Sequence, residues 1–326
     1  MHAFSTYLSA PFLPPNPEKK HVLLLGDGFL ARGFLQYIDR KKYTVEQLYK
    51  NQFINPQDVL YSFEAGRQYT GAYHLRDGFK VDRSERVDIQ SLTLEHGNKV
   101  CLNEKAYTFD YLIIGLGAAK TLQTWTDEIN SLADARNTSI GIVGMGPVGL
   151  DLGLILSSRT GPNRITLFDM LPASEVFRYS AVPEIIQNRL KETGITPLFQ
   201  EKYDPGKYAF DRVLFAVGNR RHALTETMKA DSYLRHEKYK SVYLGGDCLK
   251  VQTAQAAYDQ GKYIAEQLNS TPSAPSASTW QKPYHPVDKG SALHIGAGKI
   301  LVGNHRVIPD GVYPSFLLKL YSFFFI

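Results

Sequence analysis

Two glycine-rich turns constrain this chain more than any other feature. Each follows an aliphatic run typical of a buried parallel strand, and each opens a helical pattern. The G-x-G-x-x-G/A positions are occupied by Gly26, Gly28 and Ala31 in HVLLLGDGFLARGF and by Gly144, Gly146 and Gly149 in IGIVGMGPVGLDLG. Glycine lets the backbone turn tightly and approach a pyrophosphate, whose charge is met by the helix N-terminus. One such turn is weak evidence, but two in this context predict a chain that binds two dinucleotides.

Composition is consistent with a two-domain globular protein. A chain of 326 residues is long enough for two nucleotide-binding domains with separate cores. The hydrophobic fraction of 43% and the charged fraction of 21% are ordinary for such a protein. The net charge of +5 is spread along the chain without a basic and aromatic stripe. We therefore expect no nucleic-acid partner.

Cysteine and histidine spacing excludes two kinds of site. Cys101 and Cys248 are far apart and form neither a C-x-x-C nor a C-x4-C pair. This excludes a disulfide framework and a redox-active dithiol. The nine histidines show no metal-ligand spacing, so we expect no metal.

The two ends of the chain differ from the rest. Residues 1–20 are rich in proline and lack a basic n-region, which favours a loose N-terminal arm, with a transit peptide as the alternative. The segment Tyr313–Ile326 has a single charge, Lys319, and is too short to cross a bilayer. We expect it to dock on a membrane surface or a partner protein, with packing on the protein's own core as the alternative.

Further segments extend the two-unit pattern. In the second unit, the strand RITLFD ends at Asp169, where a carboxylate can accept the ribose hydroxyls of an adenine dinucleotide; the alternative is a solvated aspartate at a strand end. Residues 62–107 alternate apolar and polar positions, as antiparallel strands do. Buried strands ending in glycine turns are expected at FDYLIIGLGAA, RVLFAVG and SVYLGGDC, and a helix is expected over Thr253–Leu268.

The order of these segments resembles the flavoproteins with two dinucleotide-binding domains, and most closely the type II (alternative) NADH:quinone oxidoreductases. The resemblance covers most of residues 20–326. It is carried by GDGFLARGF, FDYLIIGLGA, IVGMGPVGLDL, LFAVG, YLGGDC, TAQAAYDQGKYIA and DKGSALHIGAGKILVG. The T-A-Q-x-A helix after Gly-Asp is its most specific part, and it favours the quinone-reducing branch.

The resemblance implies an α/β fold of two doubly wound, Rossmann-like domains followed by a short apolar C-terminal segment. The FAD domain would be discontinuous, formed by 21–119 and 236–300, and the NAD(P)H domain, 120–235, would be inserted in it. Residues 1–20 would be the N-terminal arm, and 301–326 would be the docking segment. The implied cofactors are FAD and NADH, and the implied substrate is a quinone.

The resemblance also assigns roles to individual residues. Binding of FAD would use Gly26, Gly28, Ala31, Gly117 and Asp247. Binding of NADH would use Gly144, Gly146, Gly149, Asp169 and Gly218. Asp151 would lie close to the nicotinamide, and Ala254 and Gln255 would face the flavin and the quinone, with Asp259 also at the quinone site. Asp151 and Gln255 are the expected catalytic residues.

Three features depart from the family pattern. Tyr49 stands where the first unit should present a carboxylate to the FAD ribose, and Glu46 lies three residues too early. Asp259 replaces the last glutamine of A-Q-x-A-x-Q, and the adjacent Gln260 points about 100° away on a helix. The connection between Gly194–Thr196 and RVLFAVG is too short for the family's antiparallel meander.

These observations leave two functions open. The first is an FAD-dependent NAD(P)H dehydrogenase that passes a hydride from NADH to flavin and electrons to a quinone at a membrane, with the mitochondrial inner membrane as the expected location. The second is a non-catalytic, flavoprotein-like subunit with a structural role in a larger assembly, a mitochondrial one included. The intact second turn favours the enzyme, whereas Tyr49 and Asp259 favour the subunit.

Overall fold

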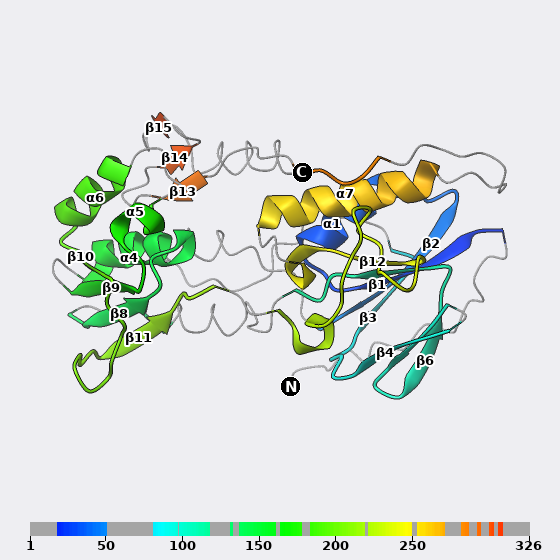
Figure 1. Ribbon diagram of the computed structural model, residues 1–326, viewed down its shortest axis with the longest axis horizontal. Coiled ribbons are helices and arrows are strands. Elements are labelled where there is room, and N and C mark those ends of the chain that lie inside the picture. Colours follow the sequence, from blue (N-terminus) through cyan, green and yellow to red (C-terminus); the bar gives the residue numbers. More distant parts are fainter. Residues whose placement is uncertain are drawn as a thin grey trace, which may run out of the picture. The chain divides into compact units, whose positions relative to one another are not determined.

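The computed structural model describes residues 18–50, 81–96, 98–117, 131–132, 137–160, 164–177, 183–218, 221–249, 253–270, 282–286, 292–294, 300–302 and 306–308. These residues form two compact units (Figure 1). The first unit draws its described residues from the ranges 18–50, 81–116 and 224–284, and the second from 117–223 and beyond 284. The first unit is therefore discontinuous and the second is inserted in it, which confirms the predicted fold class.

A parallel sheet forms the centre of the first unit. Its order is β12-β7-β1-β2-β3, and every neighbouring pair is parallel. The strands are β1 (Lys20–Leu25), β2 (Tyr43–Tyr49), β3 (Arg83–Arg86), β7 (Tyr111–Ile114) and β12 (Val242–Leu244). The aliphatic run Val22–Leu25 is fully buried. A continuous apolar run suits a parallel strand because both of its faces are covered.

Two helices cover one face of this sheet. They are α1 (Phe29–Tyr37), which follows β1, and α7 (Ala254–Ser270), which follows β12. A Cβ at Gly33 would lie 2.0 Å from the Tyr258 carbonyl oxygen, and one at Gly261 would lie 2.0 Å from that of Leu30. The two helix backbones are thus in direct contact, which joins the returning segment to the first turn.

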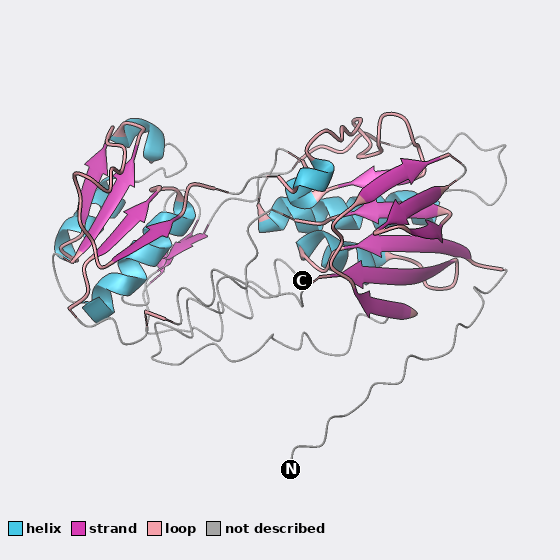
Figure 2. Ribbon diagram, turned by 90° about the horizontal axis from the view of Figure 1, so that it is seen from below, coloured by secondary structure: helices cyan, strands magenta, loops and turns pink. Residues whose placement is uncertain are grey.

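An antiparallel sheet covers the opposite face. It consists of β4 (Leu92–Glu95), β5 (Lys99–Leu102) and β6 (Lys105–Thr108), within the region predicted to alternate (Figure 2). Val100 and Leu102 of β5 share one apolar cluster with Leu23 and Leu25 of β1. The first unit is therefore a three-layer structure in which the central strands β1 and β7 are buried on both sides.

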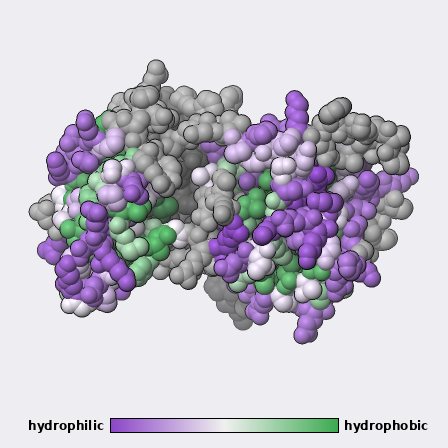
Figure 3. Space-filling model, viewed as in Figure 1, coloured by the Kyte–Doolittle hydropathy of each residue, from purple (hydrophilic) through white to green (hydrophobic). Residues whose placement is uncertain are grey.

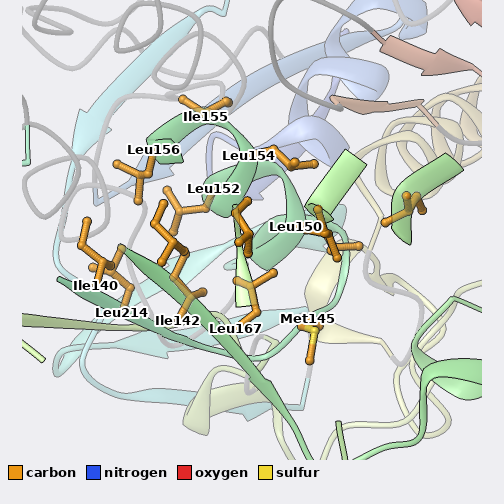
Figure 4. Close-up of a cluster of buried hydrophobic side chains, with 14 of the residues drawn as sticks. Ile140, Ile142, Met145, Leu150, Leu152, Leu154, Ile155, Leu156, Leu167 and Leu214 are labelled. Atoms are coloured by element: carbon orange, nitrogen blue, oxygen red, sulfur yellow. The ribbon is translucent and has the colours of Figure 1, made fainter. Parts of the chain in front are cut away.

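The second unit repeats the parallel arrangement on a smaller scale. Its sheet has the order β10-β9-β8-β11, again parallel throughout. The strands are β8 (Ile140–Val143), β9 (Ile165–Asp169), β10 (Thr196–Phe199) and β11 (Arg212–Phe215), and the helices are α4 (Pro147–Thr160), α5 (Ala173–Val176) and α6 (Pro183–Glu192). Figure 4 shows α4 contributing Leu152 and Ile155 to an apolar cluster that includes Ile142 and Leu167 of the sheet.

A short aromatic loop covers part of the other face of this sheet. The Phe168 ring lies 4.9 Å from the Tyr208 ring, 5.4 Å from that of Tyr203 and 5.8 Å from that of Phe210, measured between centroids. The loop is tied together by the Lys207–Glu201 ion pair at 2.6 Å. This loop connects β10 to β11. It stands in place of the antiparallel meander expected from the family resemblance.

The borders of the units differ from the expected ones. Residues 224–235 group with the first unit, not with the NAD(P)H domain, because Leu234 is buried in a cluster that includes Tyr243 of β12. Beyond residue 284, β13 (Ala292–His294) contacts α4 of the second unit and pairs with β14 (Ile300–Val302), which pairs with β15 (Arg306–Ile308). The expected first-domain segment 236–300 therefore divides near residue 284.

Two predictions about the chain ends fall outside the described residues. Residues 1–17 of the arm and 309–326 of the apolar segment are not described. Within the described ranges, none of the helices has the length and apolarity needed to cross a membrane.

Candidate dinucleotide-binding sites

The first glycine turn joins β1 to α1. Gly26 has a φ of +111°, and a Cβ there would lie 2.1 Å from the Gly115 carbonyl oxygen, so only glycine fits. Gly28 is different, because no described atom lies within 4 Å of its would-be Cβ. Ala31 is only 1% exposed and packs in the apolar cluster beneath the turn. The open side of the turn is thus at Gly28.

The second turn, between β8 and α4, repeats these contacts. Gly144 has a φ of +105°, and its would-be Cβ lies 2.5 Å from the Ala216 carbonyl oxygen. Gly146 again has no described atom within 4 Å, whereas a Cβ at Gly149 would lie 1.9 Å from the Gly144 carbonyl oxygen. The three glycines therefore close the turn, leave open space and allow close helix packing, in that order.

Both open positions lie at helix N-termini suited to an anion. The first turns of α1 and α4 contain no acidic residue, and the N-cap of α1, Gly28, makes no side-chain capping bond. Backbone N–H groups at such an end, together with the helix dipole, attract a phosphate group. The arrangement fits the pyrophosphate of a dinucleotide.

Asp169 ends β9 beside the second turn. Its carboxylate accepts hydrogen bonds from the backbone N–H of Met145, at 2.8 Å, and of Leu171, at 2.9 Å. The side chain is only partly buried. Asp169 therefore holds the turn in place and keeps carboxylate acceptor capacity for a ribose hydroxyl.

Two further glycines lie at corresponding strand ends. Gly117 follows β7 with a φ of +74°, and Gly218 follows β11 with a φ of +84°. In both cases no described atom lies within 4 Å of a would-be Cβ. Each of the two parallel sheets thus has a second open backbone turn directly after one of its strands.

The Gly-Gly-Asp turn after β12 brings Asp247 to the same edge as the first glycine turn. Gly245 N–H donates to the Ile114 carbonyl at 3.2 Å, and Asp247 lies in the short helix η2 (Gly246–Cys248). Burial raises the pKa of the Asp247 carboxyl above its ordinary 3.8. Among the described residues, none donates a hydrogen bond to it, so a ligand hydroxyl would be its natural donor.

Gln255 lies at the start of α7, next to Ala254. Its amide nitrogen is buried without a hydrogen-bond partner among the described residues. A buried amide donor normally has an acceptor, so this one fits a polar group of a bound cofactor. Asp259 lies one turn later and is partly exposed. Asp151, in α4 of the second unit, is also partly exposed.

Two glutamines at these sites were not predicted as functional. Gln260 is 1% exposed, and its side-chain oxygen accepts a hydrogen bond from Gly246 N–H at 2.7 Å. Gln47, 5% exposed, donates from Nε2 to the Gly26 carbonyl at 2.9 Å and to Asp27 at 3.2 Å. Each is a buried side chain that holds the backbone of one candidate ligand-binding turn by a hydrogen bond. A polar residue inside an apolar pattern was the available signal for both.

The described residues also bear on metal binding. No group of three or more His, Cys, Asp and Glu side chains there could hold a metal ion. The sites therefore rest on backbone turns and single polar side chains.

Comparison with solved structures shows the fold. NDH2 from Plasmodium falciparum, in complex with NADH, superposes with a TM-score of 0.73 at 13% identity, covering 93% of this chain and 94% of the other. The water-forming NADH oxidase from Lactobacillus brevis, bound to NADH, gives a TM-score of 0.68 at 14% identity, covering 87% of this chain and 75% of the other.

A third similar structure is a longer protein. The NAD-dependent persulfide reductase from A. fulgidus gives a TM-score of 0.64 at 16% identity, over 86% of this chain. This chain spans 63% of that reductase. No protein-family model matches the sequence, and the search of curated proteins finds no match either. The predicted Rossmann-like architecture is thus the fold that this chain shares with these three structures.

Proposed function

We propose that the protein is a flavin-dependent NAD(P)H oxidoreductase with FAD in the first unit and NADH in the second. One observation carries this proposal. Both units repeat the same turn, in which the first glycine closes on a neighbouring carbonyl and the second faces open space at a helix N-terminus. Two such turns need two pyrophosphates, and a single-nucleotide enzyme would not need the second.

Four groups that follow strands of the first parallel sheet or begin its helices would hold the flavin nucleotide. Gly28 gives the pyrophosphate access to backbone N–H groups, and Gly117 does the same at the next strand end. Asp247 accepts a hydrogen bond from a hydroxyl of the ribityl chain, which would provide the donor that its carboxylate lacks among the described residues. The buried amide of Gln255 donates to an acceptor on the cofactor.

In the second unit, Asp169 selects the nucleotide. A carboxylate accepts hydrogen bonds from a free 2′-hydroxyl and repels a 2′-phosphate, so NADH should bind more tightly than NADPH. The pyrophosphate would lie against Gly146 and the N-terminus of α4, and Gly218 would flank it. Asp151 on α4 is the residue proposed to lie near the nicotinamide.

The chemistry is that of the cofactors: bound flavin accepts a hydride from NADH and returns two electrons to an acceptor. The protein supplies position and electrostatics. For the acceptor we propose a quinone, reached through Ala254, Gln255 and Asp259 at the start of α7. The similarity to NDH2 over nearly the full length of both chains supports this choice.

The proposed setting is a membrane surface, with the mitochondrial inner membrane as the specific hypothesis. Support comes from the sequence of residues 313–326, which combines ten large apolar or aromatic side chains with one lysine. Deletion of residues 314–326 tests it. Release from membranes with the fold intact is expected, and unchanged partitioning would contradict the anchor.

A non-catalytic subunit is the second candidate. Tyr49 at the end of β2 favours it, because the first unit lacks the carboxylate that would hold the ribose of a tightly bound FAD. In that case the fold would serve as a structural module of a larger assembly.

One experiment separates the two candidates. The purified protein is examined for visible flavin absorption, and NADH is then added without oxygen. An enzyme shows the flavin spectrum and loses it on NADH addition, then recovers it with a soluble quinone. Protein that stays colourless after reconstitution with FAD contradicts the enzyme.

A further inference from the structure

The two units differ at the strand end that faces the adenosine ribose. In the second unit, β8 pairs with β9 so that Val143 lies opposite Phe168, and Gly144 N–H donates to the Phe168 carbonyl at 2.7 Å. The next residue is Asp169. In the first unit, Leu25 lies opposite Leu48, and Gly26 N–H donates to the Leu48 carbonyl, also at 2.7 Å. The next residue is Tyr49.

Asp169 and Tyr49 also lie on the same face of their sheets, the face covered by the helix that follows the glycine turn. Asp169 follows Ile165 and Leu167 in the strand alternation, and both of these pack in the cluster beneath α4. Tyr49 follows Tyr43 and Val45, which pack in the cluster with α1. Tyr49 therefore occupies the position and face of Asp169, and the missing carboxylate is not supplied by a shift of register.

No neighbouring carboxylate of β2 replaces it. Glu46 is three residues earlier, about 10 Å along the strand, and alternation puts it on the other face. Its carboxylate is paired with His21 Nε2 at 3.4 Å and with Arg83 at 3.4 Å. The His21 contact lowers the pKa of the Glu46 carboxyl. Glu46 thus belongs to an ion-pair cluster near the start of β1.

A cation stands beside Tyr49. β2 and β3 pair so that Tyr49 lies opposite Arg86, and residues paired in this way share a face of the sheet. Arg86 is exposed, and its Nε donates to the Lys50 carbonyl at 2.9 Å, which holds the guanidinium at the end of β2. The Lys50 ammonium is paired with Asp88 at 2.9 Å. The strand end thus presents a phenol and a guanidinium instead of a carboxylate.

We propose that the adenosine end of the first site, formed by Tyr49 and Arg86, accepts a ribose with a 2′-phosphate as well as the unphosphorylated ribose of FAD, whereas Asp169 excludes a 2′-phosphate from the second site. A guanidinium binds a phosphate through paired N–H donors, and a phenol adds a donor without a charge. The inference rests on the first turn being a dinucleotide site, as in the proposed function, but not on flavin being its occupant.

Isothermal titration with ADP and with 2′-phospho-ADP tests this proposal. Gly146→Val is included to block the second site, with circular dichroism to verify the fold. We expect 2′-phospho-ADP to bind at least as tightly as ADP. Adding Tyr49→Glu should weaken 2′-phospho-ADP binding about tenfold relative to ADP, the effect of ~1.4 kcal/mol. Tyr49→Gln should keep the wild-type preference, because glutamine has the shape of glutamate without its charge.

A second variant tests the cation. Arg86→Gln should weaken binding of 2′-phospho-ADP and leave that of ADP unchanged. The proposal is overturned if ADP is preferred more than about tenfold, if the Glu and Gln variants at residue 49 behave alike, or if neither compound binds. Flavin absorption and its loss on addition of NADH are measured in a separate experiment, which tests the proposed function independently of the ribose preference. A functional flavoenzyme with strict ADP preference would overturn only this inference, and a colourless protein with the expected preference would overturn only the flavin assignment.

Discussion

The open space at Gly28 and Gly146 allows each proposed nucleotide site to be blocked without damage to the fold. The changes are Gly28→Val and Gly146→Val. No described atom lies within 4 Å of a Cβ at either position, and Gly28 has a φ of −85°, which valine tolerates. In Figure 3 the second unit shows green apolar areas among its purple polar surface, and Val148, two residues after Gly146, is itself 49% exposed.

The expected magnitudes differ between stability and binding. Exchanging glycine for an aliphatic residue at a helix N-cap costs up to about 1 kcal/mol of the free energy of unfolding. A side chain in the pyrophosphate position removes at least one hydrogen bond to a charged group, worth ~1.5–3 kcal/mol. Nucleotide binding should therefore weaken about 10- to 150-fold while the protein stays folded.

Two assays read the two sites separately. Flavin retained after dialysis reports the first site, and fluorescence titration with NADH reports the second. We expect Gly28→Val to lose flavin only and Gly146→Val to lose NADH affinity only. Matched controls are Gly33→Ala and Gly149→Ala, whose Cβ atoms would lie 2.0 Å and 1.9 Å from backbone oxygens. These controls should lose about 1–3 kcal/mol or more of unfolding free energy, and they should therefore unfold at a lower urea concentration. Wild-type flavin retention in Gly28→Val would refute the assignment of the first turn.

Three further changes test single side chains. Asp169→Asn should reduce the preference for NADH over NADPH about tenfold in a binding titration, because the repulsion of a 2′-phosphate is removed; an unchanged preference would exclude a role in selection. Asp247→Asn should stabilise the ligand-free protein against urea increasingly as the pH rises above 3.8, since the raised pKa means that ionisation in the folded state costs stability; a pH-independent difference would contradict this. Gln260→Leu should cost about 1–3 kcal/mol of unfolding free energy by leaving a buried backbone N–H without its acceptor. A neutral result would show that another group takes over.

The sequence predicted the parts of the fold that depend on local backbone chemistry. Aliphatic runs followed by G-x-G identified β1 and β8 with their helices, and Gly-Gly-Asp followed by small residues identified the return to the first unit through α7. These patterns are readable because only glycine permits a φ of +111° at Gly26 and the contact of Gly33 with α7. The boundary near residue 224 was not readable, because it depends on Leu234 packing against a strand that comes later in the chain.

The candidate sites were predictable where a residue type at a fixed spacing carries the signal. Asp169 was predicted from its spacing, and the structure places its carboxylate at the second turn, where it accepts a hydrogen bond from Met145 N–H. Gln260 was set aside because its angle on α7 differs from that of Asp259, and the same angle turns its side chain to the Gly246 amide. The aromatic loop that covers Phe168 also had no sequence signal, because its rings come from a connection without regular structure.

The two turns also show how the first site could change without losing its shape. In the second unit, one side chain, Asp169, holds the turn and is also the residue proposed to bind the ribose. In the first unit, Gln47 holds the turn from a buried position two residues before the strand end. Holding the turn therefore does not depend on Tyr49, and the strand-end residue is under no structural demand to be acidic. This separation explains how a glycine turn with intact geometry can coexist with a phenol at the end of β2, and it is consistent with the proposal that Tyr49 and Arg86 of β3 set the specificity of the first site.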